Sequence, residues 1–428
     1  MEKASNSLAL IFFPAFDWAI SPTHPEREER LLYTRDQVVE EGLLDVEGIF
    51  EFNPLIAKDK DINRTHICVP DLDTRITKSH RISAGGAIRA AKAVAEGEAD
   101  KSFALVRPPG HHARRIVYGV RGFCTINIEA IMIEYLRKNY DINKIAVIDT
   151  DCHHGDGTQD IYRNDPDVLF ISIHQDGRTL YPGSGFINEK GGASAEGYTL
   201  NIPLPPGSFD KEYLYIIENL VLDVLDDFDA DIVINSAGQD NHFSDPLTNM
   251  NISAKGYAKL NDLLDPDIAV LEGGYSIEDA LPYINTGIIM AMAGLDYSNV
   301  KEVGIKNSIN DKNLTGEIEK ISSKVKNVWE NRKKSIEGEY KYNRSVFYDT
   351  DGINERQNEI LYNCDKCNGF SVINSTADSG YNIKAIILSN NICNDCNEKA
   401  YNIYNKTKLS NFDYVYLQDK REDNLKFK

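Results

Sequence analysis

Residues 144–159 read KIAVIDTDCHHGDGTQ, and the fold class can be inferred from this segment. A short apolar run comes first, and three Asp and two His follow it directly. Apolar runs without polar alternation are typical of strands buried on both faces, as in a parallel sheet. Reactive side chains just after such a strand lie where open α/β sheets bind their ligands. The stretch therefore predicts a parallel sheet with a functional site at the carboxyl end of its strands.

The same pattern recurs along the chain up to about residue 298. Helical stretches such as 84–97 and 211–228 separate the runs, which predicts an α/β fold whose parallel sheet is covered by helices on both faces. The further candidate strands are LALIFF (8–13), SFALV (102–106), VLFISIH (168–174), DIVINSA (231–237) and DIAVLEGG (267–274).

After residue 298 the composition changes, and Asn, Lys and Asp become frequent. We therefore predict a catalytic domain over 1–298, a helical linker over 299–345, and a small C-terminal domain over 346–428. The chain has a net charge of −19, which disfavours nucleic-acid and anionic-lipid partners and favours a cationic substrate. No apolar run is long enough to span a bilayer, so we expect a cytoplasmic protein.

The strand-end residues offer a metal site. Side chains alternate along an extended strand end, so Asp149, Asp151 and His153 point to one side. A carboxylate and an imidazole suit Zn²⁺, and a catalytic site needs a third protein ligand and an open position. Asp240, which follows the strand 231–237, is the predicted third ligand. For Asp245, before Pro246, we favour a turn-forming role.

Two other strand ends add proton-transfer groups. His111 and His112 follow a Pro-Pro-Gly turn, and Asp149 and Asp156 are the carboxylates that could pair with them. A neighbouring carboxylate fixes the tautomer of an imidazole and raises its pKa. Tyr275 follows a pair of glycines and could donate its hydroxyl to a developing oxyanion.

These motifs together resemble the histone deacetylase family, which shares the arginase-like α/β fold with acetylpolyamine amidohydrolases and acetoin-utilisation proteins. The resemblance covers roughly the first seven-tenths of the chain. It rests on motifs that occur in the order of the family: HPEREERL (24–31), PPGHH (108–112), GFC (122–124), DTDCHHGDGTQ (149–159), SAGQD (236–240) with DPL (245–247), and EGGY (272–275).

The resemblance implies roles for single residues. Asp151, His153 and Asp240 would bind the catalytic Zn²⁺, and His112 would be the general base, with His111 as its partner imidazole. Asp149 would pair with His111 and Asp156 with His112, and Tyr275 would polarise the acetyl carbonyl. Phe123 and Tyr181 would wall a tunnel for the acyl-lysine, beside Gly122 and Gly274. A structural K⁺ would use Asp149, Asp151, His153, Ser172 and the carbonyl of Ile173.

The entrance of the tunnel is less closely matched. Family members often hold the substrate backbone with an acidic rim residue, and Asp71 and Asp73 both remain candidates for it. Our hypothesis is that Asp176, in the loop after residue 174, attracts a cationic substrate.

The C-terminal segment carries two CxxC pairs. Cys364 and Cys367 are separated from Cys393 and Cys396 by 25 residues, a spacing compatible with a four-cysteine zinc ribbon built on two hairpin knuckles. Four thiolates leave no open position, so this second Zn²⁺ would be structural. A redox role for one pair is the weaker alternative.

We therefore predict a zinc-dependent deacetylase that acts on an acetylated lysine side chain or an acetylated polyamine. An arginase-like ureohydrolase and a non-catalytic acetyl-group binding scaffold are the alternatives. The sequence leaves open the acyl chain length and whether the chain forms a homo-oligomer.

Overall fold

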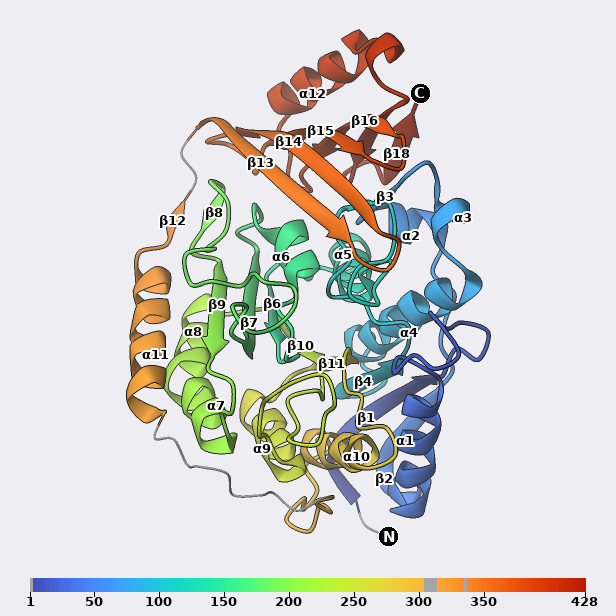
Figure 1. The fold of residues 1–428 in the computed structure, drawn as a ribbon, viewed down its shortest axis with the longest axis vertical. Helices are drawn as coiled ribbons and strands as arrows, with labels where there is room; N and C mark the ends of the chain where they lie inside the picture. Colours follow the sequence, from blue (N-terminus) through green and yellow to red (C-terminus); the bar gives the residue numbers. More distant parts are fainter. Residues whose placement is uncertain (1–2, 304–313, 335–336) are drawn as a thin grey trace.

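A computed structural model describes residues 3–303, 314–334 and 337–428. Its largest sheet is parallel, with eight described strands in the order β2-β1-β4-β11-β10-β6-β7-β9 (Figure 1). The strands are β1 (Lys3–Phe13), β2 (Glu47–Phe52), β4 (Lys101–Val106), β6 (Ile145–Asp149), β7 (Val168–Gln175), β9 (Thr199–Leu204), β10 (Ile232–Ala237) and β11 (Ile268–Leu271).

Helices cover both faces of this sheet because its strands are apolar on both sides. In β1, Leu8 and Leu10 point into one hydrophobic core while Ala9 and Ile11 point into the other. The first core is closed by α1 (Glu29–Glu40), α7 (Asp210–Ile216), α8 (Leu222–Phe228), α9 (Ala254–Leu264), α10 (Ala280–Met292) and α11 (Thr315–Glu330). The second is closed by α4 (Lys78–Ala95), α5 (Ile128–Asn139) and α6 (Asp156–Tyr162).

The predicted fold class is thus confirmed, and all six predicted strands lie in the sheet. The edge strands β2 and β9 were not predicted. β2 contains Glu47 and Glu51, and Asn201 and Pro203 interrupt β9, which is a composition that sheet edges tolerate.

Short elements connect these layers. They are η1 (Leu43–Asp45), α2 (Asp59–Asn63), α3 (Leu72–Arg75), the π-helical turn η2 (Ile217–Val221), and two small two-stranded sheets, β3 (Ile67–Cys68) with β5 (Ile116–Val117) and β8 (Ala195–Glu196) with β12 (Lys333–Lys334). None of the helices in the described ranges combines the length and apolar composition needed to cross a bilayer.

The helix expected within residues 299–345 is α11. It buries Ile318, Ser322, Val325 and Trp329 along one side, the spacing of an amphipathic helix. Residues 304–313 of the expected linker lie outside the described residues. The next sheet begins at Gly338, before residue 346, and the domain boundaries at residues 298 and 345 stay a prediction.

The C-terminal segment forms a six-stranded sheet in the order β13-β14-β15-β16-β17-β18 (Figure 1). We call residues 338–428 the C-terminal domain. Its elements are β13 (Gly338–Tyr348), β14 (Ile353–Asn363), β15 (Phe370–Ala377), β16 (Asn382–Leu388), α12 (Asn394–Lys406), η3 (Leu409–Asn411), β17 (Tyr414–Asp419) and β18 (Asn424–Phe427).

The two faces of this second sheet have different neighbours. One face packs against β3 and β5 of residues 3–303, which we call the α/β body. The shared hydrophobic core is made of Ile67, Val69, Ile116 and Tyr118 from the α/β body and of residues that include Val346, Tyr348, Ile373 and Tyr416 from the C-terminal domain. The opposite face packs against α12. The C-terminal domain is therefore docked on the α/β body by a buried apolar interface.

Buried ion pairs reinforce that interface. Lys420 of the C-terminal domain lies 2.9 Å from Glu134 of α5, and both side chains are buried. Glu359 accepts from Arg163 at 2.6 Å, and Arg64 of the α/β body pairs with Asp423. These pairs fix the docked orientation because a buried charge without its partner is costly.

We expect Glu134→Ala to destabilise the protein by about 3 kcal/mol or more, because it leaves the Lys420 ammonium buried without its carboxylate partner. Urea unfolding followed by fluorescence measures the change. The matched control is Glu47→Ala, which breaks the exposed pair with Lys3 and should cost less than about 1 kcal/mol. Equal effects of the two substitutions would contradict the buried interface.

Candidate metal centre and pocket

The strand order brings the predicted metal ligands together. Strands β6 and β10 are parallel neighbours, with Asp149 opposite Ser236. Asp151 and His153 follow β6, and Asp240 follows β10, so the three side chains meet at the carboxyl edge of the sheet. One potential ligand atom from each of the three lies within 4.8 Å of the other two.

The three groups form a buried cluster. His153 Nδ1 lies 3.1 Å from Asp151 Oδ1 and 2.8 Å from Asp240 Oδ2. Backbone N–H groups hold the carboxylates: Gly273 donates to Asp151 at 2.7 Å and Cys152 to Asp240 at 2.7 Å. Two carboxylates and one imidazole with fixed orientations fit the three-ligand set of a catalytic zinc site.

The electrostatics of the cluster favour a cation. Burial acts to lower the pKa of His153, but the carboxylates of Asp240 and Asp151 raise it to about 10. Burial, followed by repulsion from Asp151, raises the pKa of Asp240. A positive charge at this point offsets the negative charge of the two carboxylates, and either a proton or a metal ion can supply it.

The predicted histidine–carboxylate pairs are both formed. His111 Nδ1 lies 3.1 Å from Asp149 Oδ2, and His112 Nδ1 lies 2.9 Å from Asp156 Oδ1. Burial and then the neighbouring His111 lower the pKa of His112 to about 3. Burial would also lower the pKa of His111, but Asp151 and Asp149 raise it well above its usual value. The pKa values of the two adjacent imidazoles are therefore shifted in opposite directions.

Two arginines that the sequence analysis did not single out hold Asp156. Arg114 donates to Asp156 Oδ2 at 2.8 Å and Arg121 at 2.9 Å. Burial alone would raise the pKa of Asp156, but Arg121 and Arg114 hold it well below its usual value. Their place in the sequence, just after the two histidines, gives no sign that they turn back toward Asp156.

Tyr275 lies in the loop that follows β11, and two side chains hold this loop in place. Its N–H donates to Asp245 Oδ2 at 2.7 Å, and the buried Arg30 donates to the carbonyl of Gly274 at 2.8 Å. Gly274 has φ +120°, which lets the chain turn there. Asp245 therefore positions Tyr275 as well as forming a turn. Within the described residues the Tyr275 hydroxyl has no hydrogen-bond partner.

His111, His112, Asp151, His153 and Tyr275 line one pocket of about 260 Å³. Gly122 is required at its wall, because a Cβ there would collide with the His112 ring and approach the Tyr181 ring to 2.9 Å. The lining consists of Pro109, His111, His112, Gly122, Phe123, Cys124, Asp151, His153, Leu180, Tyr181, Leu247, Gly273, Tyr275 and Asp349. Asp349 comes from the C-terminal domain, and the sequence analysis had not connected it with the pocket.

Other predicted site residues lie around this pocket. Ser172 is opposite Asp149 in the pairing of β6 with β7, and the Ile173 carbonyl accepts from the Tyr213 hydroxyl at 3.2 Å. Asp176 is not brought to the pocket: its carboxylate pairs with Arg178 and borders a separate hollow. Asp71 and Asp73 lie at the start of α3, and Asp71 caps that helix through the Thr74 N–H at 2.9 Å.

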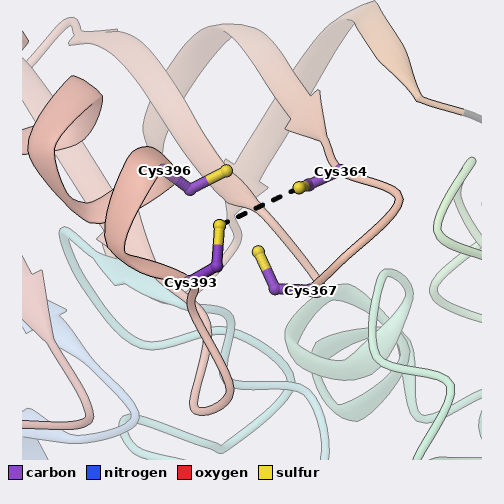
Figure 2. A group of neighbouring side chains, drawn as sticks. All are labelled: Cys364, Cys367, Cys393 and Cys396. Carbon is purple, nitrogen blue, oxygen red and sulfur yellow. Dashed lines mark hydrogen bonds between the residues drawn. The ribbon is translucent and has the colours of Figure 1, made fainter.

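The four cysteines converge in the C-terminal domain (Figure 2). Cys364 and Cys367 lie between β14 and β15, and the Cys364 and Cys393 sulfurs are 4.0 Å apart. Zinc–sulfur bonds of about 2.3 Å give tetrahedral sulfur separations of about 3.8 Å, so the cluster fits such an ion. The second pair differs from the expected knuckle: Cys393 caps α12 and Cys396 lies in its first turn, because the chain crosses over from β16 to β17 there.

Comparisons with known proteins agree with this geometry. The model of the histone deacetylase domain matches residues 70–292. A probable deacetylase of Archaeoglobus fulgidus is 45% identical over 309 residues, covering 66% of this chain and 85% of the relative. A histone deacetylase-like amidohydrolase of Pseudomonas aeruginosa is 36% identical over 224 residues, covering 50% of this chain and 58% of the relative.

A solved structure is similar as well. The crystal structure of the HDA15 HD domain superposes with a TM-score of 0.64 at 26% identity, covering 75% of this chain and 95% of that one. A parallel sheet with a buried carboxylate–imidazole cluster at its carboxyl edge defines the class. The chain belongs to the histone deacetylase family.

Proposed function

We propose that this protein is a zinc-dependent deacetylase that hydrolyses the amide of an acetylated amine. The observation that carries the proposal is that one pocket is lined by Asp151 and His153 of the metal cluster, by His112 and by Tyr275. Relatives named as a deacetylase and as an amidohydrolase support the reaction class.

His112 acts as the general base toward water. Its Nδ1 is engaged by Asp156, which leaves Nε2 to take the proton of a water in the pocket. The carboxylate of Asp156, kept charged by Arg114 and Arg121, stabilises the imidazolium that results. His112 then returns the proton to the nitrogen of the leaving amine.

Tyr275 stabilises the charge that develops on the acetyl oxygen. Its hydroxyl has no other partner in the described chain, and its backbone is fixed by Asp245. Such a preorganised donor strengthens its hydrogen bond as the carbonyl becomes an oxyanion. Zn²⁺ bound by Asp151, His153 and Asp240 would supply Lewis acidity toward the carbonyl and the water.

The walls of the pocket indicate the shape of the substrate. Phe123 and Tyr181 line it from two loops, and Gly122 lets its backbone lie close to the rings of His112 and Tyr181, which contact each other with centroids 5.1 Å apart. A narrow apolar channel of this kind fits an alkyl chain such as that of acetyl-lysine or an acetylated polyamine. A K⁺ ion held by Asp149, Asp151, His153, Ser172 and the Ile173 carbonyl would stiffen the strand ends below it.

The four-cysteine cluster would hold a second, structural Zn²⁺. It joins the β14–β15 connection to the start of α12. Four thiolates and no open position give such an ion a folding role rather than a catalytic one.

We expect Tyr275→Phe to lower kcat for an acetyl-lysine peptide by about 100- to 1,000-fold, the typical loss for one oxyanion donor. Tyr283→Phe is the matched control. Its hydroxyl contacts Lys301 at the surface, so activity should stay within about twofold of wild type. Full activity of Tyr275→Phe would overturn the proposed mechanism.

Metal analysis tests both ion sites. We expect about two zinc ions per chain in the purified protein. Asp240→Ala should lose the catalytic ion and the activity yet retain the other ion, while a double Cys364→Ser, Cys393→Ser variant should lose the structural one. Two ions retained by Asp240→Ala would refute the catalytic site.

A further inference from the structure

The mouth of the pocket includes a residue from outside the region that matches the family. Of the described lining residues, Asp151 and Asp349 carry carboxylates, and Asp151 belongs to the metal cluster. Asp349 lies in the turn between β13 and β14 of the C-terminal domain, and its side chain is exposed. The acidic group at the mouth thus comes from the C-terminal domain.

Hydrogen bonds fasten the β13–β14 turn to the loop that carries the pocket wall. The Tyr348 ring is buried, and its hydroxyl donates to the Ile116 carbonyl at 2.8 Å. Asp351 Oδ2 accepts from the Val120 N–H at 2.6 Å. Arg121 donates to the Phe347 carbonyl at 2.5 Å with the same guanidinium that holds Asp156. The turn is therefore a fixed part of the pocket rim.

Asp349 has a defined orientation within this rim. Its Oδ1 accepts from the Gly122 N–H at 3.0 Å and from the Tyr181 hydroxyl at 3.2 Å. Both donors belong to the channel walls. Neither donor is charged, and in the described chain no cationic side chain forms an ion pair with Asp349. Its negative charge therefore remains available to a ligand, and Oδ2 is the oxygen left to receive a donor.

We propose that the C-terminal domain completes the substrate site, and that Asp349 selects acetylated amines that carry a second positive charge, such as acetylated polyamines. This inference rests on the proposed function. With the acetyl group at the metal cluster, the alkyl chain occupies the Phe123–Tyr181 channel and the distal ammonium reaches the carboxylate at the mouth. Asp349 is thus a specificity-determining residue.

Asp349→Asn tests the proposal because the amide oxygen can still accept both hydrogen bonds while the charge is lost. Two substrates are compared: N-acetylputrescine, and N-pentylacetamide, in which a methyl group replaces the ammonium. We expect the KM for N-acetylputrescine to rise about tenfold, equivalent to about 1.4 kcal/mol, with kcat unchanged. Kinetics with N-pentylacetamide should not change. Asp349→Glu should recover part of the lost affinity.

Asp351→Asn is the matched control. It makes the same change in net charge two residues away, and Asp351 does not line the pocket, so the ratio of kcat/KM for the two substrates should stay at its wild-type value. In the wild type this ratio should fall as salt rises from roughly 0.05 to 0.5 M, because screening weakens the charge contact.

The outcomes separate the two proposals. The role of Asp349 would be overturned if the wild type hydrolysed both compounds with similar kcat/KM. It would also be overturned if Asp349→Asn lowered kcat/KM equally for both compounds. Either result would leave the deacetylase assignment standing. Hydrolysis of neither these compounds nor an acetyl-lysine peptide by the zinc-loaded protein would overturn both. If Asp349→Asn and Asp351→Asn lowered kcat/KM for N-acetylputrescine equally, both residues would only hold the β13–β14 turn in place, and the proposed role of Asp349 would be wrong.

Discussion

Repulsion between the buried carboxylates of Asp151 and Asp240 is the constraint around which the rest of the site is arranged. Parallel strands β6 and β10 end side by side, so the loops that follow them must place these two charges close together and away from water. Backbone N–H groups offset part of the cost, and His153 bridges the pair. The remaining excess of negative charge favours a cation at this point.

Much of the surrounding structure serves to keep that cluster and its neighbours in place. Glu272 accepts the N–H groups of Gly110 and His111, so the end of β11 fixes the loop that carries the two histidines. Arg30 and Arg107 share the buried carboxylate of Glu26 and hold the loops on either side. These buried, charged contacts hold the loops at the sheet edge in place.

The sequence predicted the parts of the site that lie close to strand ends. The apolar runs located β6, β10 and β11, and their carboxyl ends gave Asp151, His153, Asp240 and Tyr275. Sequence could not supply the contacts that depend on how distant segments pack. Asp349 lies in a polar turn without any motif, and only the docking of the C-terminal sheet on β3 and β5 brings it to the pocket. Asp176 follows a strand end, which is why the sequence suggests that it lies at the entrance. In the structure it pairs with Arg178, away from the pocket.

The shared apolar core between β3, β5 and the C-terminal sheet also bears on what counts as an autonomous unit in this protein. The match to the family ends at residue 292, so a shorter fragment of the protein could be designed to end there. A fragment ending there would bare the side chains of Ile67, Val69, Ile116 and Tyr118, all of which are fully or almost fully buried in the whole chain. Such a patch drives self-association in water. The region that matches the family is therefore smaller than the unit in which these four side chains are buried.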